Sequence, residues 1–439
     1  MVATAIGTAH AEAQSVTDSL GVEIVRLAAL VDSLSREVAR LQGAGQEVDA
    51  EDALAQLRAA AQAAAAAGGG AQRGATPADQ EFVGRQRSLQ ALNPEISVNA
   101  DGFAQVNKDA TGQDNFFMRA FEIAIVSNLD PFSRAKFFFV RGQEAGTLTP
   151  FETSGPEEEE GGSFVAEEAF IEWVGLPGGF GLKFGRFFQQ FGQLNRWHQH
   201  ALPVQSRSLP HIAFLGQEAL GGTGLSLHWL LPTGGGSGTY ETTWEIARKE
   251  NENLYGSAGG VSLLGNFNAF WNLSAATDLD VSVNWISGGY ADGSTSLDRD
   301  LFAVEGAFSW RPPARARYSG LVLRGGYMAL RGLLPVDADG TGASGDEAGR
   351  GVARGAWTAG EVRLNQSWLA GARLDWAQNP LNTNESAWLV APTLTWWQSE
   401  YVRLRLEYDL LGRSASRFKE GRLLFQIVFA VGPHKHETY

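Results

Sequence analysis

The sequence predicts an all-β membrane protein, a 16-stranded antiparallel transmembrane β-barrel with an N-terminal α-helical coiled-coil segment. Two observations carry this prediction. Beyond residue 93, segments of roughly 9–15 residues alternate apolar with polar or small residues, which is the weak two-residue period of transmembrane strands. The connections between these segments alternate between short and long, as they do in barrels that cross the outer membrane of bacteria.

The residues before the barrel are expected to form a periplasmic stalk. Residues 1–14 hold small-x-small steps and are predicted to be the remnant of a signal peptide, with an ordinary N-terminal tail as the alternative. Residues 15–42 are predicted to form a coiled coil, and residues 43–92, rich in Ala and Gly, a helix and a linker. The coiled coil is indicated by heptad positions that hold leucine or a β-branched residue, namely Leu20, Leu27, Leu34, Leu41, Ile24, Val31 and Val38.

The barrel domain is predicted to span residues 93–439. An even number of strands places both ends of the barrel on the periplasmic side. The strands are expected near residues 96–106, 116–127, 134–142, 164–175, 180–187, 222–231, 239–249, 260–272, 279–289, 299–311, 317–330, 354–365, 367–377, 386–398, 401–411 and 421–431.

The connections and the Trp residues agree with this assignment. Connections after even-numbered strands are short, whereas those after odd-numbered strands are mostly long and polar, for example 142–163, 289–298 and 331–353. Trp residues near the strand ends predict two interfacial girdles. The girdle beside the short turns would hold Trp173, Trp229, Trp271, Trp310, Trp396 and Trp397, and the other girdle Trp285, Trp357, Trp376 and Trp388.

Composition and motifs disfavour several other classes. The sequence contains no run of about 18 apolar residues, which a transmembrane helix would need. Its formal charge of −14 argues against a nucleic-acid partner, and the absence of Cys fits export. No nucleophile elbow, P-loop or HExxH motif occurs, so we expect neither an enzyme nor a bound cofactor.

Alternation along the strands predicts which charges face the lumen. Within 401–411 four charged residues share one face: Arg403, Arg405, Glu407 and Asp409. A charge that faces lipid near the midplane costs about 2–4 kcal/mol, so this face should line a water-filled interior. Acidic residues such as Glu305 and Glu361 would keep any preference for anions weak. The same rule predicts a basic track along the lumen, made of Arg324, Arg363, Arg373, Arg403 and Arg405.

A long connection between the strand segments Gly181–Phe187 and Gly224–Leu231 is unusually rich in aromatic residues and leucine. We expect it to pack on the inner wall of the barrel as the third outer loop and to narrow the pore. The predicted pore constriction consists of Arg186, Arg196, His198, His200, Arg207 and His211.

Two of these histidines are candidate metal ligands. The spacing of His198 and His200 allows both to bind Zn²⁺ or Cu²⁺ when a third ligand converges, and His211 and Glu218 are candidates for that ligand. Hydrogen-bonded loop histidines are the alternative. The C-terminal segment His434–His436 has the same spacing and the same two interpretations.

Several short motifs are similar to the first strand, the fifth strand and the third loop of one porin family: Leu92–Val98, Gly185–Phe187, Gln190–Gly192, Asn195 and Leu202–Pro203. Through them, residues 93–439 resemble the phosphate-selective porins of the O/P type, which are β-barrels of Gram-negative outer membranes. The resemblance implies an outer-membrane location, diffusion of anions and a trimer. The chain departs from that family because its third loop has no Lys and residues 432–439 extend beyond the last predicted strand.

The predicted function is passive diffusion of small hydrophilic solutes, with a weak preference for phosphate-like anions. Expected partners are outer-membrane lipid, small or inorganic anions and further copies of the chain. The resemblance implies a trimer, whereas the heptads alone favour two parallel helices. Two alternatives stay open: a structural barrel that anchors the periplasmic coiled-coil stalk, and a channel for metal ions that uses the loop histidines.

Overall fold

The computed structural model describes residues 94–108, 115–142, 148–151, 164–233, 238–292, 295–333, 351–417 and 419–432. The predicted signal-peptide remnant, the coiled coil, the helix and linker, and the C-terminal histidine pair all lie outside these residues. Within the described residues, no helix combines the length and the apolar character that crossing a membrane requires.

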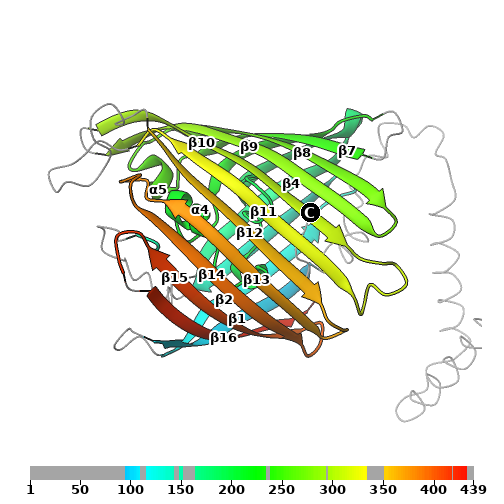
Figure 1. Cartoon of the computed structure of the whole chain (residues 1–439). Helices are drawn as coiled ribbons and strands as arrows, with labels where there is room; N and C mark the ends of the chain where they lie inside the picture. The colour runs from blue at the N-terminus through cyan, green and yellow to red at the C-terminus, as the bar shows by residue number, and fades with distance from the viewer. Residues whose placement is uncertain are drawn as a thin grey trace, which may run out of the picture. The chain divides into compact units, whose positions relative to one another are not determined.

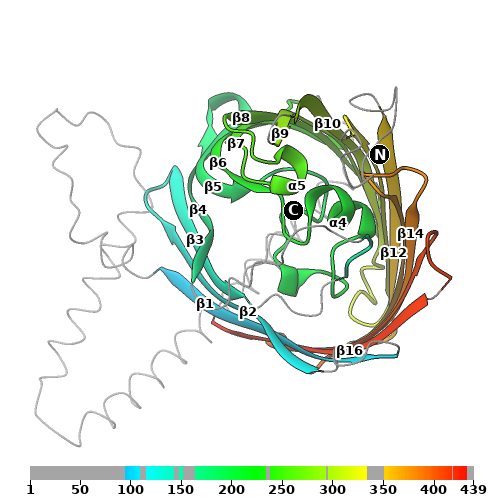
Figure 2. The ribbon, with the colours of Figure 1, turned by 90° about the vertical axis from the view of Figure 1, so that its left-hand side faces the viewer.

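Sixteen strands of the described residues form one closed antiparallel barrel, in which β1 pairs with β16 and all other partners are consecutive in sequence (Figure 1, Figure 2). Each strand overlaps the one predicted at its place, so the predicted barrel is confirmed. The strands are β1 (Glu95–Asn107), β2 (Asn115–Asn128), β3 (Ser133–Gly142), β4 (Val165–Leu176), β5 (Phe180–Phe188), β6 (Gly221–Leu230), β7 (Gly238–Arg248), β8 (Val261–Ser274), β9 (Thr277–Asp292), β10 (Thr295–Trp310), β11 (Gly320–Arg331), β12 (Val352–Arg363), β13 (Trp368–Gln378), β14 (Ser386–Trp397), β15 (Val402–Arg413) and β16 (Lys419–Val431).

Among the described residues, short helices occur in three of the connections. The 3₁₀ helix η2 (Pro177–Gly179) forms the turn between β4 and β5. The 3₁₀ helix η3 (Gln199–Ala201) and the helix α4 (Leu209–Leu215) both lie between β5 and β6, and α5 (Glu252–Tyr255) lies between β7 and β8. Figure 2 looks along the barrel and shows α4 and α5 inside the ring of strands.

Pairing of the first and last strands closes the sheet. Val98 pairs with Val431, and the register continues without interruption to Asn107 and Arg422. A closed sheet has no free edge, so the backbone groups of its strands are paired within the barrel wall. Such closure is what allows strands to stand in lipid, where no water is present to satisfy an exposed backbone.

The outer face of the barrel is apolar because each strand alternates. In β16 the side chains of Leu423, Phe425 and Ile427 are 39–43% exposed, whereas the intervening Leu424 and Gln426 are buried. The apolar residues at alternate positions of β16 are therefore on the outer surface. The adjacent strand β15 alternates in the same way, with apolar residues outside and the buried Arg403, Arg405, Glu407 and Asp409 inside.

Two predicted details are wrong. The long connection expected at 289–298 is replaced by strand, because β9 continues to Asp292 and β10 begins at Thr295. Trp357 was predicted for the interfacial girdle on the side of the long loops, but it is only 5% exposed. Its Nε1 donates to Oε1 of Glu305 at 3.4 Å inside the barrel. The girdle prediction used only the distance from the strand end and ignored which face of β12 the side chain occupies. Other Trp residues do lie on the outer surface, namely Trp310, Trp368 and Trp376.

The membrane placement predicts a dependence on depth for arginine substitutions. Leu406 lies in the middle of β15 and faces outward, so Leu406→Arg should destabilise the barrel by about 2–4 kcal/mol. Leu230→Arg at the end of β6 is the control, because the same charge near the interface costs about 0–1 kcal/mol. Urea unfolding in lipid vesicles measures both variants. Equal losses in the two variants would contradict this placement.

Candidate pore site

The segment between β5 and β6, residues 189–220, lies inside the barrel and is called the inserted loop below. Its backbone is bound on opposite walls. The N–H of Gln190 donates to Oε2 of Glu245 on β7 at 3.2 Å, and the N–H of Gln205 donates to Oε2 of Glu407 on β15 at 2.9 Å. These two strands are eight places apart in the sixteen-strand ring, so the loop crosses the lumen.

Apolar side chains of the inserted loop pack on the inner wall. Phe191, Phe214 and Leu215 belong to a buried cluster with α5 and with inward residues of β8–β12. Leu209 and Ile212 belong to a second cluster with inward residues of β13–β15. Burying one such side chain contributes about 1.5–3 kcal/mol, so the packing fixes the loop at a defined position in the lumen.

One glycine of the wall permits this approach. A side chain at Gly355 on β12 would place its Cβ only 2.7 Å from the ring of Pro210 in α4. Any larger residue there would push α4 away from the wall.

Three of the five arginines of the predicted basic track bind the inserted loop. Arg373 donates through Nη2 to the hydroxyl of Ser206 at 2.9 Å, Arg405 donates to the carbonyl of Leu202 at 3.1 Å, and Arg403 donates to the carbonyl of His200. All three side chains are buried. They face inward, where they hold the inserted loop and do not present their charge to a solute.

The other two arginines of the predicted track lie elsewhere. Arg324 donates to Oε2 of Glu361 at 2.9 Å, and its guanidinium lies 5.4 Å from the centre of the Trp197 ring. Arg363 donates to the carbonyl of Gln366 at 3.3 Å in the turn between β12 and β13. The five arginines therefore form no continuous track.

Arg207 and His211, predicted at the constriction, are buried within the inserted loop. Arg207 donates to the carbonyls of Leu194 and Trp197, both at 2.9 Å, and His211 donates through Nε2 to the carbonyl of Glu218 at 2.8 Å. Burial lowers the pKa of Arg207 to about 10, so its charge persists at neutral pH. Burial and the charge of Arg207 lower the pKa of His211 to about 3, so His211 is neutral. Both side chains stabilise the loop and are not presented to a solute.

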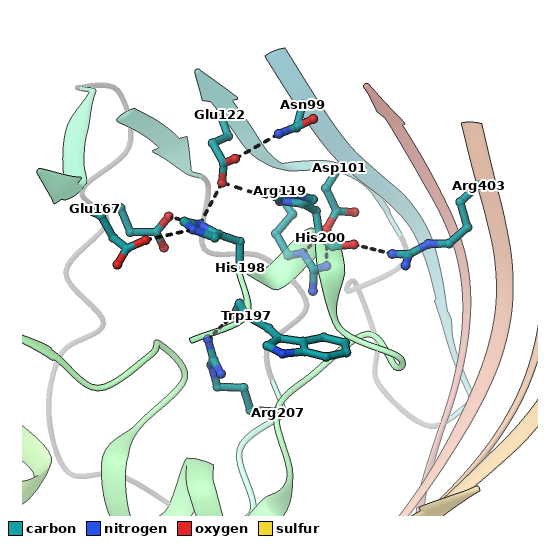
Figure 3. A network of polar contacts seen from close by, with 11 residues as sticks. Asn99, Asp101, Arg119, Glu122, Glu167, Trp197, His198, His200, Arg207 and Arg403 are labelled. Carbon is teal, nitrogen blue, oxygen red and sulfur yellow. Dashed lines mark hydrogen bonds and ion pairs between the residues drawn. The ribbon is translucent and has the colours of Figure 1, made fainter. Parts of the chain in front are cut away.

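His198 and His200 face carboxylates of the wall (Figure 3). The Nδ1 atom of His198 lies 2.9 Å from Oε2 of Glu122 and 2.9 Å from Oε2 of Glu167. Its Nε2 lies 3.2 Å from Oε2 of Glu168, and Nδ1 of His200 lies 3.6 Å from Oε2 of Glu122. Burial opposes the charge on His198, but Glu122 and Glu167 outweigh it and raise the pKa of His198 well above its usual value.

The last two predicted constriction residues lie apart from this group. Arg186 follows the 56% exposed Phe184 by two residues, so both side chains are on the outward face of β5. There Arg186 pairs with Glu250, outside the lumen. Its predicted place in the constriction is wrong, because this side chain points away from the lumen. Arg196 is half-buried in the inserted loop, where burial lowers its pKa and the charges of Glu241 and Glu245 oppose that effect.

A cavity of about 230 Å³ lies between the inserted loop and the wall of β8–β11. Its charged lining is mixed, with Asp278 and Asp280 from β9, Arg324 from β11, and Arg311 from the turn between β10 and β11. Trp197 of the loop lines the same cavity. The cavity lies toward the end of the barrel that carries the short turns.

Comparison with known sequences assigns neither a family nor a function. No family model matches the chain. A protein of Aquifex aeolicus (strain VF5) described as uncharacterized is 37% identical over 100 residues, which are 23% of this chain and 20% of that protein. The chain therefore spans about a fifth of that relative's length, and this likeness assigns no function.

Several solved structures have a similar fold. An anion-selective porin from Comamonas acidovorans is 10% identical with a TM-score of 0.51, over 77% of this chain and 99% of that one. OprB of Pseudomonas putida is 9% identical with a TM-score of 0.51, over 80% and 97%. OmpF of Salmonella typhi, solved with daunomycin, is 9% identical with a TM-score of 0.50, over 77% and 97%.

At such low identity these similarities concern the fold alone. The chain has the closed barrel fold of the outer-membrane porins. The finer resemblance to the phosphate-selective porins of the O/P type stays a prediction.

The arginine contacts predict how the inserted loop responds to substitution. Arg405→Met removes the donor to the buried carbonyl of Leu202, at a cost of about 1–3 kcal/mol. Amide hydrogen exchange of residues 199–206 should then accelerate by roughly 5- to 150-fold. Arg363→Met is the matched control, since its partner lies in an exposed turn. Equal protection of the loop in both variants would contradict the proposed contact.

His211 predicts that acid weakens the inserted loop. Its pKa falls from 6.5 to about 3 in the closed loop, so between these values only the opened loop binds a proton. Each unit of acidification in this window should favour opening by about 1.4 kcal/mol, roughly tenfold. Amide exchange of residues 209–216, corrected for its intrinsic pH dependence, measures this opening.

The variant His211→Asn isolates that contribution, because Asn keeps a donor for Glu218 but does not titrate. The variant should lose this part of the pH dependence, whereas other titrating groups affect both proteins alike. An identical pH dependence in the wild type and the variant would contradict the assignment.

Proposed function

We propose that the chain is a passive channel of the outer membrane, through which small hydrophilic solutes diffuse past the inserted loop. The observation that carries this proposal is the attachment of the loop to opposite walls of a closed barrel, at Glu245 and Glu407. A sixteen-stranded barrel is too wide for wall side chains alone to fill, so a segment that crosses the lumen sets the width of the pore.

The proposed solute path follows the cavity on the β8–β11 side of the inserted loop. The side of the lumen next to β13–β15 is less suited because Arg373, Arg403 and Arg405 bind the loop there. Along the cavity, Asp278 and Asp280 offset Arg311 and Arg324. The anion preference in this proposal is therefore weak, and the described strands offer no dense ladder of basic residues for phosphate. A trimer remains the proposed assembly.

Conductance in planar lipid bilayers tests the channel. The purified protein should conduct ions, and its reversal potential in a salt gradient should lie close to zero, slightly on the anion side. A protein that inserts without conducting would overturn the channel and favour the structural anchor. A strong cation preference would overturn only the charge assignment along the path.

The absence of Cys from the sequence allows a sharper test of the path. Gln193→Cys puts the only thiol of the chain in the lining of the cavity. Reaction with a negatively charged methanethiosulfonate reagent should lower the single-channel conductance, because added bulk and charge would obstruct the path. Asn384→Cys, exposed in the connection between β13 and β14, is the control and should react without this effect. Unchanged conductance of labelled Gln193→Cys would place the path elsewhere.

A further inference from the structure

His198 is enclosed by carboxylates that come from two different strands. Glu122 on β2 and Glu167 on β4 each place an oxygen 2.9 Å from its Nδ1. The three candidate ligand atoms all lie within 4.8 Å of one another. The group therefore differs from a surface cluster of acidic residues: it joins an imidazole of the inserted loop to two carboxylates of the wall.

A β-bulge brings Glu167 and Glu168 of β4 to the same side. Glu168 pairs with Phe138 and Ala166 pairs with Phe139, which leaves Glu167 as the extra residue between them. Adjacent residues of a regular strand point to opposite faces, whereas a bulge re-aims one of them. As a result, Glu167 and Glu168 both reach His198. Such bulges are frequent beside functional sites.

The separations suit a transition-metal ion. Zinc binds imidazole nitrogen at about 2.0–2.1 Å and carboxylate oxygen at about 2.0–2.2 Å, so ligand atoms of a tetrahedral site lie roughly 3.3 Å apart. The observed distances of 2.9 Å from Nδ1 to each carboxylate need only a small expansion to admit the ion. His200, with Nδ1 3.6 Å from the same oxygen of Glu122, is the nearest candidate for a fourth ligand.

The surrounding hydrogen bonds orient these ligands. A metal-bound imidazole commonly donates a hydrogen bond from its second ring N–H to a carboxylate. Nε2 of His198 lies 3.2 Å from Oε2 of Glu168. Glu168 is itself held by the N–H of Phe188 at 2.8 Å, and Glu122 by Nδ2 of Asn99 at 3.0 Å. Glu122 and His198 are thus oriented by neighbours that would not need to move.

We propose that Glu122, Glu167 and His198 bind one divalent transition-metal ion of the zinc type, with Glu168 orienting His198 and His200 as the fourth donor. The ion would join the inserted loop to β2 and β4. The sequence had pointed to His198 and His200, but the converging ligands are glutamates of the wall. His211 and Glu218 were the earlier candidates for a third ligand. The imidazole of His211 instead donates a hydrogen bond to the backbone carbonyl of Glu218 within the loop.

Titration of the full chain with Zn²⁺ alone tests the proposal. The protein is purified in detergent, treated with a chelator and studied by isothermal titration calorimetry. All measurements use the background variant His434→Asn/His436→Asn, so that the two C-terminal histidines cannot contribute to Zn²⁺ binding. One Zn²⁺ should bind per chain, and Co²⁺ in its place should give the absorption bands of a tetrahedral site. The readout is independent of conductance, so this proposal and the channel can fail separately.

Three further variants, made in that background, separate the site from the rest of the surface. Glu167→Gln and His198→Gln should each weaken Zn²⁺ binding by tenfold or more, in line with the usual loss on altering a ligand or its support. Glu172→Gln is the matched control, since Glu172 lies on the same strand but pairs with Arg134. Glu167→Gln also serves if His198→Gln fails to fold. Absence of Zn²⁺ binding, or binding unchanged by Glu167→Gln, would overturn the proposal.

Discussion

A peptide segment enclosed by a barrel must find a partner for each buried N–H and C=O group, and the inserted loop depends on this constraint. The wall meets it with charged side chains. Glu245, Asp375 and Glu407 accept hydrogen bonds from loop amides, whereas Arg403 and Arg405 donate to loop carbonyls. Charged side chains inside the barrel therefore bind the backbone of the inserted loop as well as facing water. Without the loop, several of them would lose their hydrogen-bond partners.

Much of the barrel could be predicted from the sequence, because lipid imposes a strict rule on each strand. In β15 and β16 apolar residues must alternate with polar ones, and that period is visible without any knowledge of contacts. The inward direction of Arg373, Arg403 and Arg405 followed from it. The contacts of these arginines with the inserted loop could not be predicted. Periodicity shows which side chains face inward, but it cannot distinguish water from another segment of the same chain.

Local irregularities set the limit at the candidate site. Glu167 and Glu168 contact one histidine only because a bulge breaks the alternation, and a two-residue period cannot reveal a bulge. Arg186 illustrates the opposite error: its charge suggested the lumen, although the alternation of β5 places it on the outward face together with the exposed Phe184. Glu122 could have been found, because it is the one charged residue in the apolar run 120–126 of β2 and alternates with the outward Phe121.

The position of the loop's partners along the chain has a consequence for folding. On one side Gln190 and Glu245 are separated by 55 residues, so this contact can form once β5, β6 and β7 have paired. On the other side Gln205 and Glu407 are separated by 202 residues, and Arg403 and His200 by 203. Contacts of such long range form late. The loop can therefore reach its final position only after the last strands have joined, which makes its docking a marker of completed assembly.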